Sequence, residues 1–348
     1  MSDFGLSRRI LHWFASLLAA TILVLICSGG LVTSHEAGMA VPDWPNSFGY
    51  NMFLFPVSRW IGGVFFEHTH RLIASGVGLL TLVLCGLTFA TEDRRWVKTL
   101  AGVAVVAVIV QGVLGGLRVT EHNQVLGLFH GCLAQSFFSL VAVIALVTSR
   151  FWRAFARREP DLGEPRLVSF RRWTLVVTAM VFIQLVLGAA MRHSHAGLSI
   201  HDFPTVYGGI LPPLEATAVN TINQMRSANS EPPTSAGLIL LQYVHRAWAV
   251  ALVGGIVSIG IAALRQTNFP SVLKRFAVIW MALVTIQFAL GAWTIWSNKA
   301  ADIATSHVLF GALTLMNGVL FSVTLCKFVA CAKTAGSDSS TRMEAARA

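Results

Sequence analysis

The chain has 348 residues, of which 55% are hydrophobic and 12% are charged, and its mean hydropathy is +0.66. Soluble domains carry about 25% charged residues, so this composition excludes an ordinary soluble domain and indicates a membrane protein. The formal net charge of +10 would suit a nucleic-acid partner, but the positions of the basic residues, described below, exclude that class.

Apolar stretches of about 20 residues, the length that crosses a bilayer as a helix, recur along the chain. No alternation of polar and apolar residues predicts a membrane barrel instead. We therefore predict an all-α polytopic membrane protein with eight transmembrane helices. Their approximate cores are 10–33, 67–90, 99–118, 126–149, 173–191, 237–264, 276–296 and 304–329.

Basic residues orient these spans. With both termini on the cytoplasmic side, nineteen of the 26 Lys and Arg residues fall inside and seven fall outside. This is the asymmetry of the positive-inside rule, and it makes anionic lipid the expected partner of the charge.

The first span follows Arg8 and Arg9 without a small-residue cleavage pattern, so we interpret it as a retained helix. The five cysteines indicate neither a loop disulfide nor a zinc site.

The second half of the chain repeats the first. Residues 29–49 align with 188–208 at a constant offset, and the shared residues include the D-[WF]-P turn at Asp43 and Asp202. Three further alignments follow in the same order: 67–71 with 242–246, 111–115 with 287–291, and 128–134 with 305–311. Four spans are an even number, so the halves are predicted to be parallel repeats, forming two tandem pseudo-symmetric four-helix bundles.

The repeat also defines the predicted organisation. The long outer loops, 34–66 and 192–236, carry Pro and Gly at fixed places and are expected to form ordered caps over the bundle. The predicted units are an N-terminal half at 1–149, a basic cytoplasmic linker at 150–171, a C-terminal half at 172–330, and a disordered polar tail at 331–348.

Four of the eleven histidines recur by the repeat: His70, His130, His245 and His307. Each opens an even-numbered helix near the outer surface, so each half places two imidazoles at similar depth. Such a pair can ligate one haem iron from opposite faces, which predicts two haem sites. The alternative is a hydrogen-bonded packing role for each histidine. Zinc would require further ligands that the pattern does not offer, and copper stays open only for the outer loops.

Arginines next to these histidines are candidates for binding the haem propionates. Arg71 and Arg246 directly follow the first histidine of each half, while Arg118 and Arg192 end the third and fifth helices. Arginine binds carboxylates with two hydrogen bonds, although any one of these side chains could instead extend toward the membrane interface. A Q-x-x-L-G motif recurs at Gln111, Gln184 and Gln287. Its Gly is expected to permit close helix approach, and its Gln to bond a neighbouring helix.

Glu67 lies three residues before His70 and therefore on the same face of the helix. A partly buried carboxylate there can move protons or stabilise positive charge. The aligned residue in the second half is Gln242, which cannot ionise. This asymmetry predicts chemistry in the first half and an electron-carrying haem in the second.

At these residues the sequence resembles the haem A synthase family of cytochrome oxidase assembly. The resemblance rests on Gly29–Gly30, PDWP at 42–45, E-x-x-H-R at 67–71, and the histidines at 130, 245 and 307. It implies oxidation of the C8 methyl of haem o to the formyl of haem a by successive hydroxylations. It also implies His70 and His130 as ligands of the substrate haem, His245 and His307 as ligands of a retained haem b, and Glu67 as the catalytic carboxylate.

The chain departs from the family pattern in its first outer loop. Many bacterial members have a cysteine pair there, whereas residues 34–66 contain no cysteine. The extra loop histidines, His35, His193, His195 and His201, are expected to be surface or cap residues, with a redox-partner or metal contact as the alternative.

The resemblance also implies surroundings and partners. It indicates a multi-pass protein of the inner cell membrane with haem sites toward the outer face. The expected partners are haem o and haem a, membrane lipid, the farnesyltransferase that makes haem o, an electron-transfer partner or quinone, and a second copy of the chain, but no nucleic acid. Two competing functions are a non-catalytic di-haem electron carrier and a haem o carrier or chaperone.

Overall fold

A computed structural model describes residues 3–154 and 164–345 of the chain, which form helices, short 3-10 turns and two isolated β-bridges but no β-strand. Within these ranges eight helices are long and apolar enough to cross a membrane, so the prediction of eight transmembrane helices is confirmed. These helices are α1 (Asp3–Ser34), α2 (Gly62–Thr91), α3 (Arg95–Thr120), α4 (Gln124–Thr148), α6 (Glu164–His193), α8 (Ala236–Arg265), α9 (Ser271–Trp296) and α10 (Ala301–Ala345).

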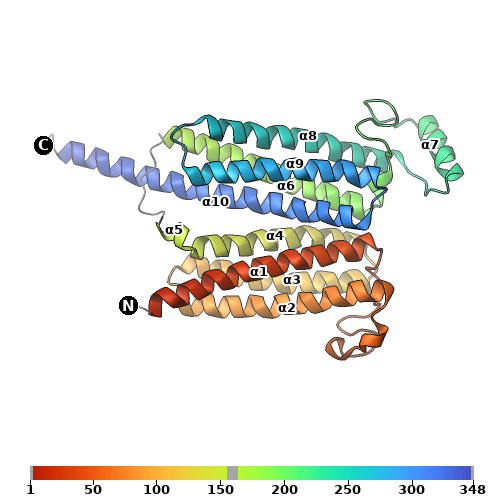
Figure 1. Ribbon diagram of the computed structural model, residues 1–348, viewed down its shortest axis with the longest axis horizontal. Coiled ribbons are helices and arrows are strands. Elements are labelled where there is room, and N and C mark those ends of the chain that lie inside the picture. Colours follow the sequence, from red (N-terminus) through yellow and green to blue (C-terminus); the bar gives the residue numbers. More distant parts are fainter. Residues whose placement is uncertain (1–2, 155–163, 346–348) are drawn as a thin grey trace.

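The long helices form two groups of four. Helices α1 to α4 pack against one another, as do α6, α8, α9 and α10, and Figure 1 shows the groups side by side. The groups meet where α1 and α4 contact α10, and where α4 contacts α6. Consequently α4 and α10 are the most buried spans, and both carry one of the repeated histidines.

Apolar side chains fill the interior of each helix group and also cover its outer surface. Leu18 and Phe138 are buried in the first group, and Trp280 and Phe321 in the second. Side chains such as Ile109 point outward and are 58% exposed. A helix satisfies its own backbone hydrogen bonds, so an apolar outer face suits contact with lipid tails.

The start of α1 and the end of α10 lie at one end of the molecule, and the long connections lie at the other (Figure 1). We call the latter the histidine end, because it contains the N-terminal parts of α2, α4, α8 and α10, on which the repeated histidines lie. The first connection contains η1 (Met52–Leu54) and η2 (Val57–Arg59). The second contains η4 (Ala196–Leu198) and α7 (Ala216–Ala228), a helix that the sequence analysis did not predict.

Two segments at the opposite end differ from their predictions. The tail expected to be disordered from 331 continues α10 as a helix to Ala345. Extending an existing helix avoids the unfavourable nucleation step, so a polar tail can remain helical. The linker predicted over 150–171 contains α5 (Arg150–Ala154) and the start of α6 at Glu164. Residues 155–163 of the linker and 346–348 of the tail lie outside the described residues.

Candidate functional site

The four repeated histidines lie at one level of the histidine end. His70 on α2 and His130 on α4 belong to the first group, and His245 on α8 and His307 on α10 belong to the second. At 1.5 Å per residue, each lies about 9 to 14 Å from the start of its helix. The two imidazoles of each group are close enough to act on each other electrostatically. The structure therefore brings the predicted pairs together, one pair in each half.

Each of these imidazoles packs against a glycine of a neighbouring helix. A Cβ atom added to any of the four glycines would lie 3.0 or 3.1 Å from the histidine Cε1, closer than ordinary van der Waals contact. Because glycine has no side chain, each histidine ring can occupy space that the side chain of a larger residue would fill. The pairs are Gly29–His70, Gly115–His130, Gly188–His245 and Gly291–His307.

The Q-x-x-L-G motif supplies three of these glycines, and its glutamines bond the same histidines. Gln111 Nε2 donates to the His130 carbonyl at 3.0 Å, and Gln184 Nε2 donates to the His245 carbonyl at 3.1 Å. Gln287 Nε2 lies 3.4 Å from His307 Nε2. The prediction that the glutamines bond a neighbouring helix is confirmed, and the sequence analysis missed only that the histidines are their partners.

The two nitrogens of the first-half imidazoles have different surroundings. His130 Nδ1 lies 3.2 Å from the Gln111 carbonyl, and His70 Nδ1 is buried without a hydrogen-bond partner among the described residues. Nε2 of neither ring forms a hydrogen bond with the described residues, although the Leu25 backbone lies close to the His70 ring. A metal-bound imidazole uses one nitrogen for the metal and directs the other to a carbonyl or carboxylate. Nε2 atoms without a hydrogen bond in the described residues are the ones that fit a haem ligand.

The second-half histidines also have buried Nδ1 atoms without a partner in the described ranges. Their Nε2 atoms each lie near a glutamine amide, at 3.2 Å for His245 and 3.4 Å for His307. A metal at Nε2 would replace these two contacts. Over the described residues no three His, Cys, Asp or Glu side chains converge as a metal site. Haem iron needs only two protein ligands, because the porphyrin supplies the rest, and each half offers one such pair.

Glu67 is buried beneath the first outer connection, and both carboxylate oxygens have partners. Oε1 accepts from Arg71 Nη2 at 2.7 Å, and Oε2 accepts from the Val41 N–H at 2.9 Å. Arg71 also donates to the carbonyls of Val41 and Asp43, at 2.8 and 2.6 Å. The prediction that this connection is an ordered cap is confirmed by these bonds. Arg71 binds the cap through both Nη atoms, which limits what it could offer a propionate.

The second connection is held in the same way. Gln242 Oε1 accepts from the Ile200 N–H at 2.7 Å, and Arg246 donates to the carbonyls of Ile200 and Asp202 at 3.1 and 2.8 Å. Arg246 Nε is buried without a partner in the described residues and remains available to a ligand. Burial raises the pKa of Asp202, but the Gly208 N–H, the Thr205 hydroxyl and other donors lower it overall. Each cap is therefore fixed by one Arg and one Asp of the repeat.

Arg118 and Arg192 lie where the two groups meet. Arg118 Nη2 would be 2.5 Å from a Cβ on Gly38, and Arg192 Nη2 donates to the Gly30 carbonyl at 2.7 Å and to Ser34 Oγ at 2.9 Å. The Arg192 bonds join α6 of the second group to α1 of the first. These two arginines act on each other electrostatically, so two positive charges are near one another here.

The extra histidines separate into two kinds. His35, His195 and His201 are exposed, and His201 pairs with Arg226 and Glu231 in the second cap. The expectation of a surface or cap position is wrong for His193, whose Cε1 would lie 2.6 Å from a Cβ on Gly127. The last turn of α6 packs against α4 at this point, which the sequence could not indicate because it depends on how the halves meet.

His68 is a buried residue whose partners the sequence analysis did not predict. It is fully buried, and its Nδ1 lies 3.1 Å from Ser47 Oγ in the first cap. The rings of Phe55 and Trp60 lie 5.0 and 4.8 Å from its own ring. Its aligned residue is Tyr243, so this contact belongs to the first half alone. His68 therefore fixes the cap next to Glu67.

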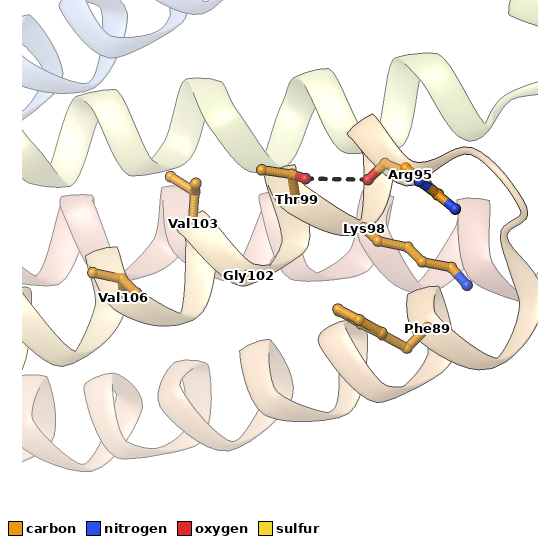
Figure 2. Close-up of a pocket in the computed structure, with 7 residues that line it drawn as sticks. All are labelled: Phe89, Arg95, Lys98, Thr99, Gly102, Val103 and Val106. Atoms are coloured by element: carbon orange, nitrogen blue, oxygen red, sulfur yellow. Dashed lines mark hydrogen bonds between the residues drawn. The ribbon is translucent and has the colours of Figure 1, made fainter.

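A surface groove lies away from these residues, near the start of α3 (Figure 2). Arg95 and Lys98 lie at one end of this groove, and Val103 and Val106 lie along it (Figure 2). Lys98 is about 20 Å along α3 from Gln111 at 1.5 Å per residue. An apolar groove with basic residues at its end fits lipid better than it fits the chemistry of the histidines.

Comparison with known proteins identifies the family of this chain. The model of a family described as cytochrome oxidase assembly protein matches residues 61–319, which include all four histidines and Glu67. A protein of Bacillus cereus named heme A synthase is 26% identical over 307 residues, which is 87% of this chain and 89% of the relative. One of the same name from Alkalihalophilus pseudofirmus is 25% identical over 322 residues, or 90% of this chain and 98% of the relative.

Proposed function

This chain belongs to the family of cytochrome oxidase assembly proteins, and we propose that it acts as a haem A synthase, an oxidoreductase that converts the C8 methyl of haem o to the formyl of haem a. The conversion proceeds by successive hydroxylations and serves cytochrome oxidase biogenesis. The names of its relatives support this activity. The observation that carries it is the pair of glycine-packed imidazoles, His70 and His130, on the same level as a buried carboxylate, Glu67.

In this proposal the first half holds the substrate. His70 and His130 bind the iron of haem o between α2 and α4, and their glycine partners fix the planes of the imidazoles. The Gln111 carbonyl accepts from His130 Nδ1, which leaves Nε2 free to ligate. Residues 34–61 cover this site and restrict the access of water to it.

The second half holds the cofactor, with His245 and His307 as the residues that would bind haem b. Haem b would supply one-electron transfer to the reaction. Arg246 Nε has no partner among the described residues and lies next to His245 in the chain, so it is the donor we assign to a propionate there.

Glu67 acts as the catalytic carboxylate of the first half. Its charge is held by Arg71 and by the Val41 N–H. A carboxylate stabilised in this way can stabilise positive charge that develops on the substrate, or accept a proton when the Arg71 contact opens. Gln242 keeps the backbone bond in the second half but cannot do either.

The proposal also covers the membrane location, the orientation and the partners of the protein. We place it in the inner cell membrane with both termini in the cytoplasm and the histidine end at the outer face. The farnesyltransferase that makes haem o would supply the substrate, and a quinone or other electron-transfer partner would exchange electrons. We expect the chain to contact membrane lipid and to associate with a second copy of itself.

The test is to extract haems with acid from cells that make haem o, with and without this chain, and to separate them by chromatography. We expect haem a, or its hydroxylated intermediate, only when the chain is present. Unaltered haem o bound to a folded protein would contradict the proposal and favour a haem o carrier or chaperone. Haem b alone, reduced by a quinol and reoxidised by an added electron acceptor, would favour a di-haem electron carrier.

A further inference from the structure

We propose that Arg118 is the carboxylate-binding residue of the first-half site and makes it selective for a porphyrin whose edge carries free carboxylates. This inference rests on the proposed function, because it concerns the same substrate. The sequence offered both Arg71 and Arg118 for the propionates of the first half, and we choose Arg118 because Arg71 is already bound to Glu67 and to the cap carbonyls.

Arg118 lies on the face of α3 that borders the histidines. It follows Gly115, the glycine packed against His130, by three residues, and residues three apart share a helix face. Its charge acts on both His70 and His130. The guanidinium therefore lies beside the place where a haem bound by these two imidazoles would have its edge.

This guanidinium has no hydrogen-bond partner among the residues that the structure describes. The carboxylate that acts on it is Glu67, but both oxygens of Glu67 already accept bonds, from Arg71 and from the Val41 N–H. A charged side chain inside a membrane protein is costly unless it is paired, and such residues mark functional sites. Arg118 thus has a charge and five N–H donors available for an anion.

Two glycines make room for the Arg118 side chain. A Cβ on Gly38 in the first cap would lie 2.5 Å from Nη2, and a Cβ on Gly127 at the start of α4 would lie 3.0 Å from Nε. Any larger residue at either place would push the guanidinium away. The side chain is therefore held between the cap and α4 by shape and not by its own hydrogen bonds.

The surrounding charges call for a dianion. Arg71 is balanced by Glu67, but Arg118 and Arg192 are near each other, and the printed partners of Arg192 are a carbonyl and a hydroxyl. Two positive charges are thus left without a paired carboxylate among the described residues. A haem carries two propionates, and a guanidinium binds a carboxylate with two parallel bonds.

The second half lacks this residue. At the same offset that aligns 111–115 with 287–291, the counterpart of Arg118 is Thr294, whose hydroxyl donates to the Leu290 carbonyl at 2.8 Å. The carboxylate selection is therefore expected at the substrate site and not at the cofactor site.

The test compares haem o with its dimethyl ester, in which both carboxylates are blocked, in absorbance titrations of the purified full-length protein. We expect the wild type to bind the free acid roughly tenfold to a hundredfold more tightly than the ester, as for hydrogen bonds to charged groups. Arg118→Gln should lose most of this preference. Arg95→Gln, on the same helix at the opposite end, is the matched control and should keep the wild-type preference.

Two results would overturn the inference: a wild type that does not distinguish acid from ester, or an Arg118→Gln protein that keeps the full preference. Absorbance of the second-half haem reports whether each variant is folded. If the Gln variant loses that signal, the second variant is Arg118→Lys, which keeps the charge but not the paired donors. Arg118→Lys should show a reduced preference for the free acid over the ester. An unchanged preference would contradict the inference. Haem a production by the wild type is scored separately, so failure of the proposed reaction would be seen independently of the carboxylate preference.

Discussion

The two halves of this protein share a framework and differ in charge. Both contain the glycine-packed histidine pair, the Asp-anchored turn and the Arg that binds the cap. Glu67 in the first half is replaced by Gln242 in the second, and Arg118 by Thr294. Glu92 is the C-cap residue of α2, and the C-cap residue of α8 is the uncharged Gln266. The framework is therefore common to the two halves, and these ionisable residues distinguish one half from the other.

The replacement of Glu67 by Gln242 shows how the framework survives a change of charge. Each side chain accepts a hydrogen bond from a cap N–H, that of Val41 at 2.9 Å and that of Ile200 at 2.7 Å. The carboxylate is therefore not needed to hold the cap. Its presence in one half only is best explained by the chemistry of that half.

Removing one histidine from each half should separate the two sites most sharply. We expect His245→Ala to lose the low-spin haem of the second half, because Ala cannot ligate iron, while haem o still binds the first half. His70→Ala should do the reverse. Absorption spectra and acid-extracted haems of the purified variants measure both effects. An unchanged low-spin signal in His245→Ala would refute this ligand assignment.

Exchanging the charge between the halves should have the next largest effect. Glu67→Gln keeps the acceptor for the Val41 N–H, as Gln242 does for Ile200, so the variant should fold and bind haem. Loss of the carboxylate should lower formation of haem a by about a hundredfold or more. Gln242→Glu should leave it nearly unchanged. Haem a output per bound haem is the measurement, and normal output from Glu67→Gln would remove the catalytic assignment.

The sequence predicted the features that depend on periodicity and repetition. Apolar runs gave the eight spans, and the repeat gave the histidine pairs and the equivalence of Glu67 with Gln242. It could not indicate that Arg71 and Arg246 bind cap carbonyls, because those acceptors are backbone atoms that any residue could supply. His193 at the junction was misplaced for a similar reason, since its position depends on packing between the halves.

A smaller change tests the glycine contacts. In Gly115→Ala the new Cβ would lie 3.1 Å from His130 Cε1, so the imidazole must shift by a few tenths of an ångström. We expect weaker binding of haem o, by roughly tenfold, with the second-half haem unaffected. Gly291→Ala should instead perturb the second-half haem through His307.

Gly112→Ala is the matched control. Gly112 lies on the same helix as Gly115, but a Cβ added to it would meet no atom of another element within 4 Å. An alanine in place of a helical glycine should stabilise α3 by about 1 kcal/mol. Titration with haem o and thermal unfolding measure both effects. Equal haem o binding by Gly115→Ala and Gly112→Ala would show that the contact does not orient His130.

The smallest effect concerns the end of the molecule opposite the histidines, where the halves again differ by one charge. Glu92 is buried and accepts from Arg94 Nε and Nη2, at 2.9 and 2.6 Å. Burial raises the pKa of Glu92, but the hydrogen bonds and charge of Arg94 and the charge of Arg153 lower it from 4.5 to about 2. Because the folded pKa is depressed, the carboxylate stabilises the fold above pH 4.5, and this contribution is lost as the pH falls toward 2.

Glu92→Gln should therefore lower the free energy of unfolding by about 1.5–3 kcal/mol at neutral pH, the range for hydrogen bonds to a charged group. The difference from the wild type should shrink as the pH is lowered from 4.5 to about 2. Gln266→Ala, at the corresponding turn of the second half, changes no ionisable group and should give a difference that does not vary with pH. Thermal unfolding in detergent between pH 7 and the lowest pH at which the wild type stays folded measures both. If the difference in unfolding free energy between Glu92→Gln and the wild type stays constant over this pH range, the charge of Glu92 does not stabilise the first half.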